Sequence, residues 1–163
     1  MLLYNKVNDP YHTLLRMLNI LYTIDDNTIE LERLRIYDFL LAFPSHITSC
    51  RLPQNITSKK KYFKKYINDY NTFNPRISFV RIKPIQDGVI IHLQKMLILK
   101  EIKNQNKFEL NTEKIPMTLI TDIKSIDSVL LELVCKDFSE ISLFGKNGLK
   151  ARLNIMEFKY DAN

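Results

Sequence analysis

Apolar residues recur at helical spacing near the start of the chain. The side chain of Asp9 can cap the free amide groups at the start of a helix, and Pro10 suits the first helical position. The apolar positions that follow fall on one side of a helix. The pattern therefore predicts a core-facing helix that begins at Pro10 and includes Leu14, Leu15, Leu18, Leu21 and Tyr22.

A second helix is predicted over residues 29–43. The polar residues 25–27 separate it from the first helix, Thr28 can cap it, and Pro44 ends it. Its second half, residues 36–43, is apolar on almost every side. Such a segment belongs deep in a fold or inside an interface.

Lysines and aromatic residues alternate in a third predicted helix, residues 59–70. Its apolar stripe comprises Tyr62, Phe63, Tyr66, Ile67 and Tyr70. Lysines can contact phosphates and aromatic rings can stack on bases, so a nucleic-acid contact is one interpretation. The alternative is that the aromatic side chains face the core and leave an ordinary solvated lysine face. The candidate nucleic-acid contacts are Lys59, Lys60, Lys61, Lys64 and Lys65.

Residues 77–97 allow two interpretations. Asp87 and Gly88 could form a hairpin turn between residues 77–82 and 89–93. We favour a helix that starts at Pro84, because the helical period persists through Met96. Two short strands, 97–102 and 107–110, follow as a hairpin, and a helix followed by a hairpin is the order of a winged helix.

The longest helix is predicted after Pro116. Its apolar positions are Leu119, Ile123, Ile126, Leu130 and Leu133, and it should run to about Lys136. The expected fold is mainly α with a small β-hairpin, winged-helix-like with flanking helices. We expect one domain over 1–163, with N-terminal helices in 1–72, the winged-helix portion in 73–116, and the long helix with a docked tail in 117–163.

Composition supports a folded protein of the cytoplasm. Of 163 residues, 45% are hydrophobic and 26% charged, which is typical of globular chains. Cys50 and Cys135 are expected to be buried and reduced, and no apolar run is long enough to span a membrane. The 24 Lys and Arg residues against 18 Asp and Glu give a net charge of +6, which favours acidic partners.

The residues show no pattern typical of catalysis. Three glycines are too few for a phosphate-binding loop, and His12, His46 and His92 are scattered. His46 and Cys50 fall short of the four ligands of a closed zinc site. Acidic pairs are explained by helix starts and solvated faces. We therefore predict no catalytic residue, no metal and no cofactor.

Two segments resemble a known family. Residues 8–18 (NDPYHTLLRML) and 33–44 (RLRIYDFLLAFP) are similar to the opening of the middle component of bacterial ABC-three-component conflict systems, which include the small subunit of Lamassu antiphage defence. The stretch from Asn74 to Gln86 resembles the same family's entry into its winged-helix portion.

The resemblance implies an adaptor between an SMC-like or Rad50-like ABC ATPase and a toxic, nuclease-like effector, with DNA as a further partner reached through the complex and no membrane involved. It makes five residues candidates for core or interface positions: Tyr11, Tyr37, Phe39, Phe43 and Pro44. The alternatives are a free-standing winged-helix transcriptional regulator and, from a third class, a small nuclease.

Overall fold

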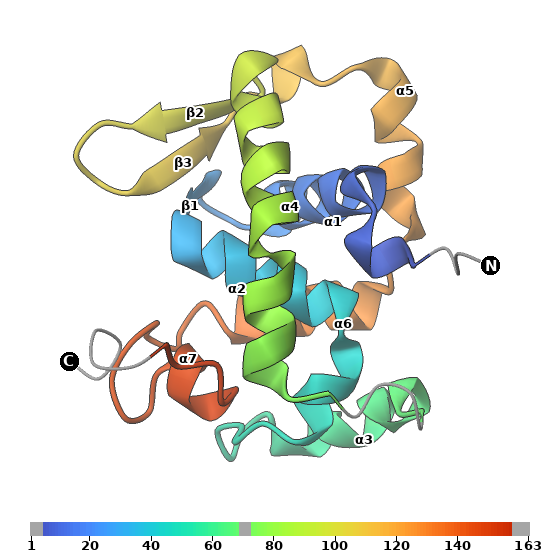
Figure 1. Ribbon diagram of the computed structural model, residues 1–163, viewed down its shortest axis with the longest axis vertical. Coiled ribbons are helices and arrows are strands. Elements are labelled where there is room, and N and C mark those ends of the chain that lie inside the picture. Colours follow the sequence, from blue (N-terminus) through green and yellow to red (C-terminus); the bar gives the residue numbers. More distant parts are fainter. Residues whose placement is uncertain (1–4, 69–72, 158–163) are drawn as a thin grey trace.

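The computed structural model describes residues 5–68 and 73–157, without the side chains of Lys124 and Ser125. The described chain is mostly helical with a small antiparallel sheet. In Figure 1, α4 crosses the front of the molecule, with α1 and α2 behind it and the sheet beside its upper end. The helices are α1 (Pro10–Thr23), α2 (Leu31–Ala42), α3 (Lys60–Phe63), α4 (Pro75–Lys95), α5 (Met117–Ile120), α6 (Ser128–Glu132) and α7 (Leu149–Arg152), and the strands are β1 (Thr28–Glu30), β2 (Leu99–Ile102) and β3 (Lys107–Leu110).

Helix α1 confirms the predicted start at Pro10. Asp9 Oδ1 accepts hydrogen bonds from the backbone amides of Tyr11, over 2.7 Å, and His12, over 3.2 Å. These bonds satisfy amides that have no partner within the helix. The buried face of α1 packs against α2 and α4.

The predicted start of the second helix at residue 29 is wrong. Thr28, Ile29 and Glu30 form β1, and α2 begins at Leu31. Ile29 lies opposite Phe108 of β3, and both side chains are buried. Pairing with a strand distant in sequence therefore overrides the local helical pattern.

The sheet has the strand order β1-β3-β2, with both neighbouring pairs antiparallel. The predicted hairpin is confirmed, and β3 occupies the predicted residues. β2 begins at Leu99 and not at Leu97, because Leu97 has the left-handed backbone angle φ 60°. The amide of Ile98 donates to the Leu93 carbonyl over 3.0 Å, which closes the end of α4.

Helix α4 decides between the two interpretations of residues 77–93. It is one continuous helix, so the helix is confirmed and the hairpin turn at Asp87 and Gly88 is wrong. It starts before Pro84, at Pro75, where the Asn74 side chain accepts a hydrogen bond from the amide of Arg76 over 3.0 Å. Pro84 and Gly88 lie inside the helix.

The basic segment is not the single helix that was predicted over residues 59–70. It consists of a 3-10 turn, Thr57–Lys59, then α3, then a second 3-10 turn, Lys64–Tyr66. Ile67 has extended backbone angles and ends the segment, while Tyr70 lies outside the described residues. The short turns allow aromatic side chains to point in different directions: Phe63 is fully buried and Tyr62 is exposed.

The predicted long helix from 117 to 136 is also wrong. Ile126 is extended, and Asp127 caps a new helix by accepting from the amides of Val129 and Leu130. Asp127 starts a new helix although the apolar spacing continues across it. The spacing alone therefore predicts a helix that is too long. The segment contains α5, a 3-10 turn (Asp122–Ser125), α6 and a π-helical turn (Leu133–Asp137).

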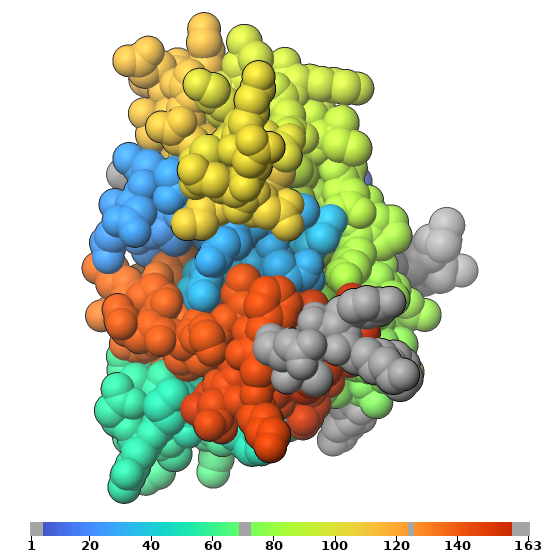
Figure 2. All heavy atoms as spheres, turned by 90° about the vertical axis from the view of Figure 1, so that its left-hand side faces the viewer, coloured from blue at the N-terminus to red at the C-terminus, as the bar shows by residue number. Residues whose placement is uncertain are grey.

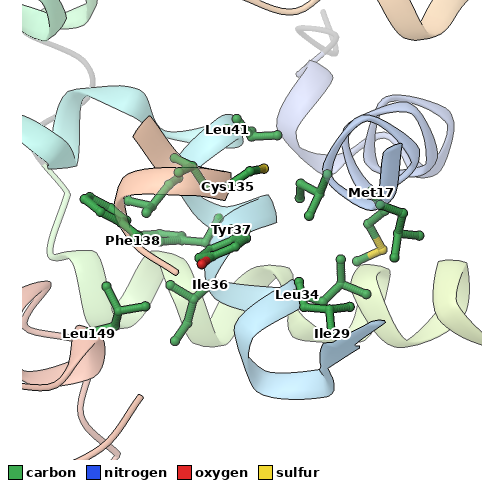
Figure 3. Close-up of a cluster of buried hydrophobic side chains, with 14 of the residues drawn as sticks. Met17, Ile29, Leu34, Ile36, Tyr37, Leu41, Cys135, Phe138 and Leu149 are labelled. Carbon is green, nitrogen blue, oxygen red and sulfur yellow. The ribbon is translucent and has the colours of Figure 1, made fainter. Parts of the chain in front are cut away.

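The core lies between α1, α2, α4 and the C-terminal segments. In Figure 3, Tyr37 of α2 lies near Cys135 and Phe138, while Leu34 and Ile29 lie on the side of Met17. Burial of these side chains supplies the main stabilisation of the fold. In the C-terminal segment, Leu149, Ala151 and Leu153 are buried.

Candidate partner-binding surface

Two of the predicted core or interface residues belong to the core. Tyr37 and Phe39 of α2 are 1% and 0% exposed. The Phe39 ring lies 5.5 Å from Phe79 of α4 and 5.3 Å from His46, measured between ring centroids. Burial raises the pKa of Tyr37 to about 12. Neither side chain is available to a partner, and Phe43 and Pro44 are half-buried.

Tyr11 lies at the surface, where it is 46% exposed. Its hydroxyl donates a hydrogen bond to Asp122 Oδ2 over 2.6 Å, and this bond raises the pKa of Tyr11. The bond ties the start of α1 to the 3-10 turn after α5. Of the five candidates, Tyr11 is the one that is exposed.

A groove lies between the start of α1 and the middle of α4. Its volume is about 480 Å³, and most of its lining is apolar. Leu14 and Val89 come from the facing sides of the two helices, and Tyr11 stands at its α1 side. The lining residues are Pro10, Tyr11, Leu14, Pro84, Ile85, Gly88, Val89 and His92.

The outer face of α4 continues this groove as an exposed apolar stripe. Ile77 is 63% exposed, Val80 47% and Ile91 51%. Ile77, Pro84 and Ile91 are spaced by seven residues, which is two helical turns, so they share a face. In Figure 1 this helix lies in front of α1 and α2, and in Figure 2 it forms the right-hand edge of the molecule. We call the residues Ile77, Val80, Pro84, Gly88 and Ile91 the α4 face.

Sequence reasoning missed this surface. The predicted helix starts at Pro84, so Ile77 and Val80 fall outside it. The seven-residue spacing of Ile77, Pro84 and Ile91 was a usable signal, but Pro84 interrupted the pattern at its centre. A contiguous apolar patch on a surface commonly marks a binding site.

The lysine segment is partly engaged within the chain. Lys59 Nζ donates to Asp137 Oδ2 over 2.5 Å, and Lys65 Nζ donates to Asp127 Oδ2 over 3.0 Å. Lys61 and Lys64 are exposed, and Lys60 is half-buried. Two of the five predicted nucleic-acid contacts therefore have acidic partners in the fold.

Asp127 gathers several donors from this segment. The hydroxyls of Tyr62 and Tyr66 donate to its Oδ2 over 2.8 and 2.6 Å, and Lys65 Nζ lies 3.8 Å from the centroid of the Tyr62 ring. Burial alone would raise the pKa of Asp127, but the hydrogen bonds from Tyr66, Lys65 and Tyr62 outweigh it and lower the pKa. The tyrosines thus fasten the lysine segment to α6, with their hydroxyl protons donated to Asp127.

Within residues 5–68 and 73–157, no three His, Cys, Asp or Glu side chains gather in a way that could hold a metal ion. Cys50 and Cys135 are buried free thiols, as predicted, and burial raises their pKa values to about 11 and about 12. His46 also lies in the interior, where burial lowers its pKa. None of the described helices is long and apolar enough to cross a membrane.

The comparison with protein families covers almost the whole chain. The model of the ABC-three component (ABC-3C) system Middle Component 5 family matches residues 2–161. The chain belongs to this family. Membership in Middle Component 5 implies that the protein works with other components of an ABC-three-component system. Comparisons with curated proteins and with solved structures give no significant match.

Proposed function

We propose that this protein is the non-catalytic adaptor of a defence complex, joining an SMC-like or Rad50-like ABC ATPase to a toxic, nuclease-like effector. The observation that carries the proposal is the Middle Component 5 match over residues 2–161. The α4 face supports it, because an exposed apolar surface of this kind suits a subunit that binds other proteins. A Lamassu-type system is the subtype that we propose.

The surface chemistry suits binding better than catalysis. The α4 face and the groove beside it carry mostly apolar side chains, and the groove lining has no carboxylate, thiol or aliphatic hydroxyl. Its polar side chains are His92 and Tyr11, whose hydroxyl donates to Asp122. General acid–base or nucleophilic catalysis needs such groups within hydrogen-bond reach of one another. We infer that the protein acts by holding partners.

DNA contact through the assembled complex is a further part of the proposal. Helix α4 followed by the β2–β3 hairpin has the order of a winged helix, which supports a winged-helix-like role. The lysines on the accessible side of the segment, Lys61 and Lys64, could contribute phosphate contacts. These contacts would not depend on base sequence.

Co-expression with the products of adjacent genes tests the adaptor role. A tagged form of the full chain should co-purify with an ATPase and an effector, and light scattering after size-exclusion chromatography should give the mass of a mixed complex. If the chain elutes as a monomer from co-expression with an adjacent ATPase, the adaptor proposal is wrong. A gel-shift series across salt should show no site-specific affinity well above the non-specific level; such affinity would favour the regulator alternative.

A further inference from the structure

The middle of α4 contains a glycine that the isolated chain does not explain. Gly88 lies inside a helix of 21 residues, and glycine is the least favourable helical residue after proline. Its backbone is not in the left-handed region, and a Cβ placed on it would meet no atom within 4 Å. Neither backbone conformation nor packing within the described chain requires glycine here.

Pro84, one helical turn earlier on the same side, also makes the helix less stable. Proline has no amide hydrogen, so the Val80 carbonyl loses its usual helical donor. Pro84 and Gly88 both line the groove beside Tyr11. Local choices that weaken an element without a gain inside the fold concentrate at functional sites. We therefore attribute both residues to contact with another molecule.

The absent side chain of Gly88 indicates the kind of contact. Glycine allows another backbone to approach a helix closely. The exposed Ile77 and Ile91 stand at either end of the same face and provide apolar anchors. A helix laid along a groove with anchors at this spacing is a common mode of recognition.

The charges around the α4 face indicate which kind of partner can bind there. Arg81 and Lys95 are exposed and stand four residues after Ile77 and Ile91, so they flank the α4 face. The one acidic residue in α4, Asp87, forms an ion pair with Arg35 of α2. A second copy would bring these cations and two net charges of +6 together, which is unfavourable. An occupant with Asp and Glu beside its apolar side chains is complementary.

We propose that the α4 face binds an amphipathic helix of another protein, whose apolar stripe is flanked by Asp and Glu and whose backbone packs closely over Gly88. This inference rests on the proposed function for the source of the helix, an ATPase or effector component. The occupant's chemistry follows from the α4 face itself.

Two substitutions at Gly88 separate stability from binding. Gly88→Ala should raise the Tm of the isolated chain by about 2–4 °C, because alanine is the better helical residue and its Cβ has room. The same change should weaken capture of the partner, and Gly88→Leu should weaken it at least tenfold. Thr118→Leu adds the same apolar side chain at an exposed site of α5 and should leave capture unchanged.

Crosslinking identifies the occupant. Ile91→Cys can carry a photoreactive benzophenone, since the native thiols of Cys50 and Cys135 are buried. In the co-expressed complex, the adduct should map by mass spectrometry to an acidic amphipathic helix, and Arg81→Glu should reduce its yield. An adduct with a second copy, or with a basic or non-helical segment, would overturn the inference.

The outcomes distinguish this inference from the proposed function. If the wild-type chain captures the ATPase and effector and Gly88→Leu captures them equally well, the α4 inference is wrong while the adaptor role stands. If the wild-type chain captures neither component, the adaptor role is wrong. An acidic helix from some other protein, crosslinked at position 91 and lost in Gly88→Leu, would then still support the α4 inference. If the wild-type chain captures neither component and no such adduct forms, both the adaptor role and the α4 inference are wrong.

Discussion

Arg16 of α1 and Asp38 of α2 form an ion pair in the interior, with Arg16 Nε donating to Asp38 Oδ1 over 2.7 Å. Asp38 is 0% exposed, and Gln86 Nε2 of α4 donates to its other oxygen over 2.8 Å. The same Gln86 nitrogen donates to the Arg35 carbonyl over 3.0 Å. One buried carboxylate of α2 therefore joins α1 and α4, the two helices that form the groove.

Removing this carboxylate should destabilise the protein strongly. Asp38→Ala leaves the Arg16 guanidinium buried without its partner, and breaking a buried pair in this way costs about 3–5 kcal/mol. Urea unfolding followed by circular dichroism measures the loss. Asp26→Ala, at an exposed position, should stay within about 0.5 kcal/mol of wild type. A loss below about 1 kcal/mol for Asp38→Ala would contradict the importance of the pair.

His46 should make stability depend on pH. Burial lowers its pKa in the folded state, so the unfolded chain binds the proton more readily below its own pKa of about 6.5. The free energy of unfolding should therefore fall as the pH is lowered from about 7 towards 5, by at most about 1.4 kcal/mol per pH unit. His46→Phe, which keeps an aromatic ring beside Phe39, should flatten this dependence.

The control for His46 is His92→Gln, because His92 is exposed on α4. Urea unfolding at several pH values should give this variant the wild-type dependence. If the slope persists in His46→Phe, another group is responsible for it.

Asp127 should stabilise the fold through the helix that it caps. Asp127→Ala removes the cap of α6 and the acceptor of Tyr62, Tyr66 and Lys65, and loss of such a cap costs about 0.5–2 kcal/mol. Because hydrogen bonds lower the pKa of Asp127 in the folded state, its stabilisation is present near neutral pH and is lost as the pH falls through that lowered pKa. The difference between wild type and variant in urea unfolding should therefore shrink in strong acid. An equal loss at every pH would show that the charge is not involved.

Leu97 occupies a position that suits glycine. It has φ 60° and is 63% exposed, whereas the other described non-glycine residues with positive φ are all asparagines. The left-handed conformation costs about 1–2 kcal/mol for a residue with a Cβ. Leu97→Gly should raise the free energy of unfolding by about 0.5–1 kcal/mol, measured by thermal and urea unfolding. Lower stability in this variant would show that the exposed side chain packs in solution.

Local signals recovered much of the fold. The cap at Asp9, the period through Met96 and the polar break before Lys107 gave α1, the helical state of α4 and the hairpin. β1 was missed because its pairing with β3 depends on residues far along the chain. The division after Ile126 was missed because apolar spacing continues through it, although Asp127 was a readable cap.

The candidate site was less predictable from the sequence. Tyr11 was identified through the family resemblance, which could not separate it from the buried Tyr37 and Phe39. The lysine segment was prominent in composition, yet acidic partners far away in sequence engage Lys59 and Lys65. The exposure of Ile77 and Ile91 depends on which side of α4 meets α1 and α2, and this is a property of packing.

The pairing of Ile29 with Phe108 bears on how the chain folds during its synthesis. The first two helices leave the ribosome with β1 between them, long before its partner strand has been translated. Contacts between distant parts of a chain form slowly, and an unpaired strand edge is open to aggregation until they do. A pause in translation placed before Lys107 should therefore favour chaperone capture of the nascent protein, whereas a pause placed late enough for Leu110 to have left the ribosome should not.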